Sequence, residues 1–217
     1  MKRVLAFLGA FNPPTVAHIE LARFVIEETG FEGVVFVPSK STYIRQEQGK
    51  DFAYSDRQRL EMLRAAAKRR PWMEVSDWEL RAETQPRTYH TLCHLRDQGY
   101  APSLLLGSDK LPELEHGWRH VEDIAGEFGF VCMTRGSDEC ARMIREDAYL
   151  KTLAPHIRVV ETPEALRGVS STEVRRRLSE ISALWREVGA LVPQEILGLI
   201  EENEKRLRGA RETETGD

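Results

Sequence analysis

The chain has 217 residues and a formal net charge of −4, and a chain of this length can bury a substantial core as one domain, or as one domain with a small subdomain. The mildly negative charge argues against broad nucleic-acid binding, which needs a strongly basic face. No apolar stretch approaches the length that spans a bilayer, and the first residues lack the profile of an export signal, so no membrane partner is expected.

The three cysteines, Cys93, Cys132 and Cys140, are odd in number and form no CxxC pair. This pattern argues against a disulfide framework and against a cysteine zinc site. Free thiols are typical of a reducing cytosol, so we expect a cytoplasmic protein.

The first predicted strand is followed by a turn that looks built to hold phosphate. An apolar run at residues 4–8 predicts a buried parallel strand, which Gly9 ends. The sequence Asn12-Pro13-Pro14 then forces an extended turn, because a residue before proline is pushed out of the helical region. Thr15 can cap the helix that follows, and the free N–H groups and dipole at such a helix start favour an anion.

His18 lies in the first turn of that helix, three residues after Thr15. Residues at this spacing are neighbours on a helix, so the imidazole can donate a hydrogen bond to a phosphate oxygen held at the same helix start. An ordinary surface histidine is an equally simple explanation of His18 taken alone.

Strand-like runs alternate with helical patterns along the next part of the chain. Strands are expected at residues 34–37, 73–75, 103–106, 128–133 and 157–160. Helices are expected at residues 55–69, 88–98, 118–125 and 137–153, and a polar, mobile loop at residues 39–54.

This alternation predicts an α/β fold with a Rossmann-like, doubly wound parallel sheet and helices on both faces. In such sheets ligands bind beyond the carboxyl ends of the strands, where the strand order reverses. Residues 9–18, Trp78, residues 107–109 and Arg135 all follow predicted strands, Trp78 in a loop. We therefore expect them along one edge of the sheet.

A second candidate phosphate site lies near the C-terminus. Ser170 and Glu173 fit a capping box, and Val169 with Val174 fits the accompanying hydrophobic staple. Arg175 lies one turn into the helix, so hydroxyls, backbone N–H groups and a guanidinium could together receive a triphosphate. A capped helix with a solvated basic face is the alternative.

The remaining residues predict helices at 183–188 and 193–207. We expect residues 1–165 to form the Rossmann-like core, residues 166–208 to form a small helical region that completes the nucleotide site, and residues 209–217 to form a disordered tail. The sequence is compatible with a homo-oligomer but indicates no particular interface.

Two tryptophans, Trp78 and Trp118, have polar neighbours and follow strand ends. Core tryptophans usually lie among apolar residues, so these two are candidates for stacking on a planar base, an interaction worth about 1–3 kcal/mol per ring in nucleic-acid binders. Packing in the core is the alternative for both of them.

Taken together, these segments resemble the nucleotidyltransferases with an (H/T)xGH-type motif, and within them the nicotinate/nicotinamide mononucleotide adenylyltransferases. Residues 9–18 are similar to the GxFNPxTxxH variant, and residues 107–118 to a GxDxL…W segment. Residues 129–135 resemble the strand that follows it, and residues 170–175 match an SSTxxR signature. Four motifs in the expected order make a specific resemblance.

The resemblance implies the roles of individual residues. His18 and Arg175 would be catalytic. ATP would contact Gly9, Ala10, Phe11, Thr15, His18, Gly107, Asp109, Ser170, Ser171, Thr172 and Arg175. The mononucleotide would contact Asn12, Trp78, Thr88, Trp118 and Arg135. Mg²⁺ would enter with ATP, held mainly by phosphates and water near Asp109 rather than by direct protein ligands.

The implied reaction joins ATP to nicotinate or nicotinamide mononucleotide, with a slight preference for nicotinate because a compact chain suits a bacterial-type enzyme. A phosphopantetheine adenylyltransferase, a cytidylyltransferase and a non-catalytic nucleotide sensor stay open as alternatives. The resemblance also leaves open which of Lys40, Arg45 and Lys50 contacts phosphate, and whether residues 39–54 close over substrate.

Overall fold

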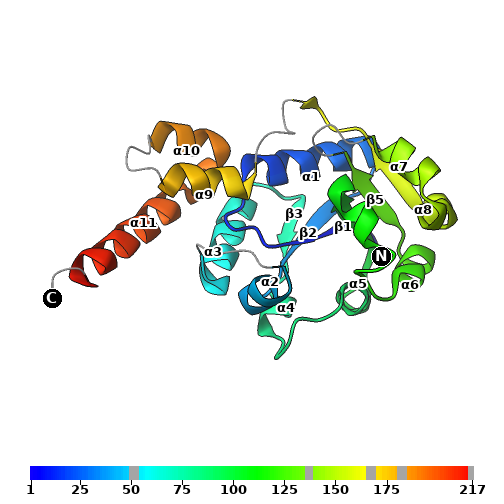
Figure 1. Ribbon diagram of the computed structural model, residues 1–217, viewed down its shortest axis with the longest axis horizontal. Coiled ribbons are helices and arrows are strands. Elements are labelled where there is room, and N and C mark those ends of the chain that lie inside the picture. Colours follow the sequence, from blue (N-terminus) through cyan, green and yellow to red (C-terminus); the bar gives the residue numbers. More distant parts are fainter. Residues whose placement is uncertain (49–53, 135–138, 165–169, 180–184, 215–217) are drawn as a thin grey trace.

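The computed structural model describes residues 1–48, 54–134, 139–164, 170–179 and 185–214. Within these residues, six strands form a single sheet (Figure 1). They are β1 (Lys2–Gly9), β2 (Gly33–Pro38), β3 (Met73–Val75), β4 (Tyr100–Gly107), β5 (Phe130–Met133) and β6 (Ile157–Val160). The strands run parallel in the order β3-β2-β1-β4-β5-β6. The predicted doubly wound sheet is confirmed, and the strand order reverses between β1 and β4.

Helices cover both faces of the sheet, which is why the middle residues of the central strands are buried and apolar. In β1, Leu5 packs into one core cluster while Val4 and Ala6 pack into the other, as alternate residues of a strand must. Every residue of β2 is buried for the same reason.

The core cluster on the first face includes residues of five helices: α1 (Val16–Thr29), α3 (Asp56–Ala67), α9 (Ser171–Ser179), α10 (Trp185–Leu191) and α11 (Gln194–Glu214). The second face packs against α5 (Thr88–Asp97), the 3₁₀ segment η1 (Ser108–Glu113), α6 (Val121–Glu127), α7 (Cys140–Glu146) and α8 (Ala148–Leu153). The short η2 (Ala154–His156) precedes β6. Figure 1 shows α9, α10 and α11 together at one end of the molecule, with α11 running away from the sheet.

Local capping explains where the two best-predicted helices begin. Thr15 caps α1 through its side chain, and Ser55 caps α3 in a capping box with Gln58. α1 ends where Gly30 adopts a left-handed backbone with φ 72°.

The prediction of a loop at residues 39–54 is wrong for its first half, because α2 (Ser41–Gln48) begins three residues after the end of β2. The Asp56 carboxylate accepts the Ser41 N–H at 2.9 Å and so satisfies a donor at the start of this helix. Ile44 is buried, but the rest of the segment is polar, so its sequence carries little helical periodicity.

Other element boundaries also differ from expectation. Trp78 does not lie in a loop but begins α4 (Trp78–Arg81), and α6 begins at Val121, three residues after Trp118. The single helix expected at residues 137–153 is two helices, because Asp147 ends α7 and caps α8 through its side chain.

At the C-terminus, α11 continues to Glu214 and so enters the segment expected to be a disordered tail. Gly209 costs a helix about 1 kcal/mol relative to alanine, but strong helix formers surround it. The division into a core and a C-terminal region stays a prediction. Within the described residues, no helix is long and apolar enough to cross a membrane.

Candidate functional site

The candidate site lies where β1 and β4 end side by side. The register pairs Phe7 with Leu105, two residues before Gly9 and Gly107 respectively, so the two strands finish at the same level. Because the strand order reverses here, this is the point at which a doubly wound sheet opens to a ligand. Gly9 and residues 107–109 thus lie at one edge, as the sequence predicts.

The segment after β1, residues 10–15, is called the β1–α1 turn below. Its backbone is held from outside by groups of the neighbouring strand and helix. The Ser39 N–H donates to the Gly9 carbonyl at 3.0 Å, and the Arg59 guanidinium donates to the Ala10 carbonyl. Carbonyls that are occupied in this way set the direction of the peptide N–H groups between them, which favours a preorganised anion site.

The C-terminal segment meets this turn directly. Arg175 Nη1 donates to the Asn12 carbonyl at 2.8 Å, and Ser171 Oγ donates to the Pro13 carbonyl at 2.7 Å. These bonds join residues about 160 positions apart. The expected convergence of the two segments is therefore present in the structure, and two helix N-termini meet at one edge of the sheet.

Ser170 caps the start of α9, as predicted. Of the two bonds of the expected capping box, the structure has one. Ser170 Oγ accepts the Glu173 N–H at 3.2 Å, and Val174 is fully buried. The Glu173 carboxylate, rather than reaching back toward Ser170, accepts bonds from Arg176 and Arg177 at 2.8 and 2.7 Å. Val169, the other half of the predicted staple, lies outside the described residues.

The charges on α9 are therefore divided between two tasks. The guanidinium groups of Arg176 and Arg177 lower the pKa of Glu173 to about 2, so this carboxylate stays ionised and offsets part of their charge. Arg175 is directed instead toward the β1–α1 turn and also donates to Thr172 Oγ1 at 3.2 Å. A guanidinium has five N–H donors, so these bonds leave capacity for a phosphate.

His18 is oriented by Thr15. Its Nδ1 accepts the Thr15 backbone N–H at 3.0 Å and lies 2.7 Å from Thr15 Oγ1. Since a backbone N–H can only donate, Nδ1 must be the acceptor, and the proton of the neutral imidazole lies on Nε2. The ring also packs edge-on against Phe11, with the centroids 5.2 Å apart. The imidazole is thus a hydrogen-bond donor of fixed direction.

Phe11 and Asn12 contribute through their backbone and through packing. Phe11 has a left-handed φ of 46° and a ring that is 2% exposed, a conformation that costs a non-glycine residue about 1–2 kcal/mol. A Cβ on Gly9 would lie 3.3 Å from this ring, which explains the glycine. The ATP contact of Phe11 stays a prediction.

Asn12 is also buried, and its side-chain oxygen accepts the Tyr54 N–H at 3.1 Å. The peptide between Asn12 and Pro13 is cis. The side chain thus joins the β1–α1 turn to the start of α3, and its contact with the mononucleotide stays a prediction.

The other predicted mononucleotide residues lie on a different set of elements from Asn12. Trp78 begins α4 and stacks on His94 of α5, with ring centroids 4.6 Å apart and an interplanar angle of 12°. One face of the indole is therefore covered, and only the other can take a pyridine ring. Thr88 begins α5. Trp118 is half-buried beside the second core cluster, and Arg135 lies outside the described residues.

Sequence reasoning missed a buried carboxylate beside Trp78. Glu79 is fully buried and accepts bonds from Gln85 Nε2 and, at 2.7 Å, from Thr91 Oγ1. Burial raises the pKa of Glu79, although the hydroxyl and amide donors around it act in the opposite direction. Its bonds connect α4 with α5, the two elements that carry Trp78 and Thr88.

Arg59 was missed as well, and Lys40 was considered only for a contact with phosphate. Arg59 was detectable, because it is in helical phase with the buried Met62, Leu63 and Ala66 of α3. Lys40, one of the three basic residues among which the phosphate contact was left open, donates from Nζ to the Leu80 and Ala82 carbonyls at the end of α4.

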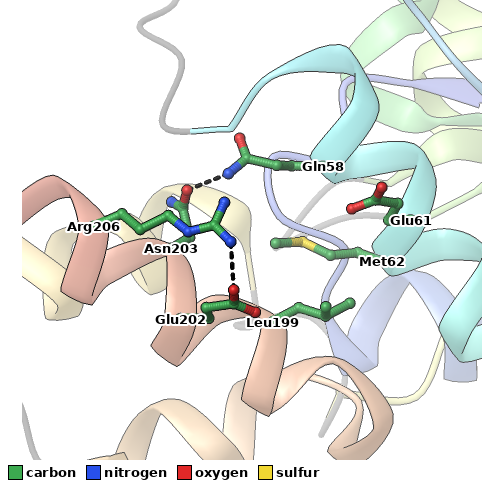
Figure 2. A pocket seen from close by; sticks show the side chains of 7 residues that line it. All are labelled: Gln58, Glu61, Met62, Leu199, Glu202, Asn203 and Arg206. Carbon is green, nitrogen blue, oxygen red and sulfur yellow. Dashed lines mark hydrogen bonds and ion pairs between the residues drawn. The ribbon is translucent and has the colours of Figure 1, made fainter.

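A small hollow of about 60 Å³ lies between α3 and α11 (Figure 2). Gln58 of α3 donates to Asn203 of α11 at its rim, and Met62 and Leu199 form its apolar side. Its volume is far below that of a pocket for a nucleotide. The hollow is therefore part of the joint between two helices rather than a second substrate site.

Both the sequence and the fold are similar to those of known proteins. The sequence matches the family described as Cytidylyltransferase-like over residues 6–177. It is 28% identical to the nicotinamide/nicotinic acid mononucleotide adenylyltransferase 2 of Caenorhabditis elegans, over 94% of this chain and 97% of that protein. It is 26% identical to a probable nicotinate-nucleotide adenylyltransferase of Caldicellulosiruptor bescii, over 82% of this chain and 87% of that protein.

The fold is similar to that of the Plasmodium falciparum nicotinic acid mononucleotide adenylyltransferase complexed with NaAD, with a TM-score of 0.70, 19% identity, and coverage of 94% and 97% of the two chains. The same enzyme complexed with APC gives a TM-score of 0.71, 18% identity, and coverage of 94% and 96%. The family match includes the β1–α1 turn and Arg175 and spans most of the chain, so this protein belongs to the cytidylyltransferase-like family.

Proposed function

We propose that the protein is an adenylyltransferase of NAD biosynthesis, joining ATP to nicotinate or nicotinamide mononucleotide to give deamido-NAD or NAD and pyrophosphate. The observation that carries this proposal is the contact of Arg175 and Ser171 with the β1–α1 turn, which places two helix N-termini around one point of the sheet edge. Such a site suits a polyphosphate. The names of the relatives, which match over most of their length, support the pyridine mononucleotide as acceptor.

In this reaction an oxygen of the mononucleotide 5′-phosphate attacks the α-phosphorus of ATP in line. A new P–O bond forms, and the bond from the α-phosphorus to the bridging oxygen breaks, so pyrophosphate leaves with that electron pair. The attacking phosphate is already ionised near neutral pH, so no general base is required. Catalysis then rests on positioning and on stabilising the charge of the phosphates.

His18 and Arg175 suit these two tasks. The Nε2–H of His18, directed by Thr15, donates to an oxygen of the triphosphate as negative charge shifts toward the leaving group. Arg175 supplies a guanidinium beside the same turn. Ser170 and Thr172 add hydroxyl donors at the start of α9, and Ser171, whose hydroxyl donates to Pro13, adds its backbone N–H.

The residues at the edge fit a magnesium ion that arrives with ATP. Asp109 presents an exposed carboxylate at the start of η1, and no cluster of three or more His, Cys, Asp or Glu residues that could hold a metal occurs in the described part of the chain. One carboxylate with phosphate oxygens and water is a typical Mg²⁺ environment. The ion would offset the phosphate charge, while Asp109 would orient its water ligands.

The acceptor pocket would be formed by the open face of Trp78, by Trp118 and by Thr88. We place nicotinate mononucleotide first, since the bacterial relative is named for the nicotinate nucleotide. A nicotinate needs positive or N–H partners only, whereas a nicotinamide also needs an acceptor.

The test is to incubate the purified protein with MgATP and either mononucleotide, and to measure pyrophosphate and dinucleotide together. We expect dinucleotide with nicotinate mononucleotide and equal amounts of pyrophosphate. Parallel reactions with CTP in place of ATP, and with phosphopantetheine as acceptor, test the sister transferases. Product only with CTP or only with phosphopantetheine would contradict the proposal. ATP binding without any product would contradict it as well.

A further inference from the structure

The residues just after β2 contact both halves of the proposed site. Ser39 donates its N–H to Gly9 and accepts a bond from Arg59 Nη2 at 2.7 Å. The next residue, Lys40, donates to α4. The three residues Ser39, Lys40 and Arg59 are called the β2 junction below. The junction links the β1–α1 turn, on the ATP side, with α4, on the mononucleotide side.

Arg59 is directed entirely toward the ATP side. Its side chain is fully buried, and the guanidinium donates to the carbonyls of Ala10 and Ser39 and to Asp56 Oδ1. A buried charge is costly, and these bonds offset the cost only while all the acceptors stay in place. Asp56 in turn accepts the Ser41 N–H, so the acceptors themselves belong to fixed elements.

The bond to Ala10 has a consequence for the neighbouring N–H group. In a trans peptide the C=O and N–H point in opposite directions. Arg59 therefore fixes the direction of the Phe11 N–H by holding the Ala10 carbonyl. This N–H belongs to the part of the β1–α1 turn assigned to phosphate, so Arg59 acts on ATP through a peptide group and not by contact.

Lys40 acts on the other side in the same indirect way. α4 has four residues, too few for a helix that is stable alone, and its last carbonyls have no partners within the helix. Lys40 Nζ donates to the Leu80 carbonyl at 2.9 Å and to the Ala82 carbonyl. The Lys40 N–H also donates to Gln85 Oε1 at 2.8 Å. These bonds hold the helix that begins with Trp78.

We propose that Arg59 and Lys40 are positioning residues with separate targets: Arg59 positions the β1–α1 turn for ATP, and Lys40 positions α4 and Trp78 for the mononucleotide. The inference rests on the proposed function. It assigns Lys40 to the acceptor pocket without contact with substrate.

The test compares the two Michaelis constants in Arg59→Lys and Lys40→Met. We expect Arg59→Lys to raise the KM for MgATP by about tenfold, the scale of losing one hydrogen bond to a charged group, and to change the KM for the mononucleotide by less than about twofold. Lys40→Met should give the reverse pattern. In the double variant the two effects should multiply, since the targets are separate.

Matched controls come from exposed residues of the same charge. Arg57 lies on the outer side of α3, paired with Glu61, and Lys68 is exposed at the end of α3. Arg57→Lys and Lys68→Met should leave both KM values within about twofold of wild type, as is usual for surface substitutions. If each junction variant raises both KM values equally, the proposal is overturned. It is also overturned if Arg59→Lys leaves the KM for MgATP unchanged and Lys40→Met leaves the KM for the mononucleotide unchanged.

Two further measurements keep the outcome decisive. Should Arg59→Lys not fold by circular dichroism, Asp56→Asn keeps the arginine but weakens one of its acceptors. It should raise the KM for MgATP alone, and an unchanged value contradicts the assignment. Should wild type make no dinucleotide, the proposed function fails on its own, and equilibrium binding of a non-hydrolysable ATP analogue and of nicotinate mononucleotide replaces the KM values. The same crossed pattern is then required.

Discussion

The two halves of the site are built by different means. On the ATP side, the β1–α1 turn is a backbone structure whose carbonyls are held by Ser39, Arg59, Arg175 and Ser171. On the mononucleotide side, side chains do most of the holding: Trp78 stacks on His94, and Glu79 joins α4 to α5. A phosphate tail is the same in every nucleoside triphosphate and can be met by backbone N–H groups, whereas a pyridine ring needs a surface of particular shape.

From this difference we expect the catalytic rate to depend mainly on the ATP side. The specificity for the acceptor should depend mainly on the mononucleotide side. The change with the largest expected effect is His18→Ala. It removes the directed Nε2–H donor, and turnover should fall by about a hundredfold or more, the scale of losing one oxyanion donor. Pyrophosphate release under saturating substrates measures it.

His18 also forms half of the α1 capping box, so this variant should lose about 1 kcal/mol of folding stability. Thermal unfolding provides the control, and assays are run well below the midpoint. Turnover close to that of wild type in the folded variant would show that His18 is only a cap.

Arg175→Ala should come next in size. The variant loses a guanidinium beside the β1–α1 turn, and ATP affinity should fall by about 10- to 100-fold, as expected for one or two charge-assisted bonds. Titration with a non-hydrolysable ATP analogue measures this. The neighbouring Arg176→Ala, whose side chain is exposed and pairs with Glu173, is the matched control. Equal losses in both variants would assign the effect to net charge.

Trp78→Ala tests the other half. Removal of the indole should raise the KM for the mononucleotide by about tenfold or more, from the loss of one stacked ring, and leave the KM for ATP nearly unchanged. His94→Ala keeps the indole but removes its stacking partner, so a smaller effect of the same kind is expected. A rise in the KM for ATP alone would reverse the assignment of the two halves.

The smallest expected effect concerns Glu79 and pH. Burial raises the pKa of Glu79 in the folded protein above its ordinary value of 4.5. Between the unfolded and folded pKa values the folded protein keeps a proton that the unfolded chain has released, so its free energy of unfolding falls as pH rises. The slope for one proton is at most about 1.4 kcal/mol per pH unit.

Glu79→Gln removes this titration while it keeps an acceptor for Thr91. Urea unfolding of both proteins from about pH 4 to about pH 8 should show wild type losing stability relative to the variant as pH rises, until the folded pKa is passed. A constant difference across this range would mean that burial does not govern the carboxyl group.

The sequence predicted those parts of the molecule whose causes are local. The apolar runs of β1 to β6, the caps Thr15, Ser55 and Ser170, and the position of each motif after a strand all depend on neighbouring residues. Topology placed residues 9–18 and 107–109 at one edge, because carboxyl ends of parallel strands share an edge. The convergence of residues 170–175 with that edge was expected from the capping motif and the family resemblance.

The parts that were missed depend on partners far along the chain. α2 begins where Asp56 accepts the Ser41 N–H, and a polar segment gives no sign of such a bond. The acceptors of Arg59 and Lys40 are mostly backbone carbonyls, which look alike in every sequence. Likewise, nothing near Trp78 reveals that one face is covered by His94.

The family match ends at residue 177, yet the chain beyond it packs against α3, the helix that carries Arg59. Helix α11 bonds to α3 through Asn203 and Gln58, and the ion pair of Glu195 with Arg70 joins it to the end of the same helix at 3.0 Å. A polypeptide truncated after α9 would retain every side chain assigned to triphosphate but would expose Met62 of α3, which packs in the same core cluster as Ile196 and Ile200 of α11. The cost of losing α11 would therefore fall first on the folding stability of the protein, because its apolar contacts help to hold α3, the helix that carries Arg59.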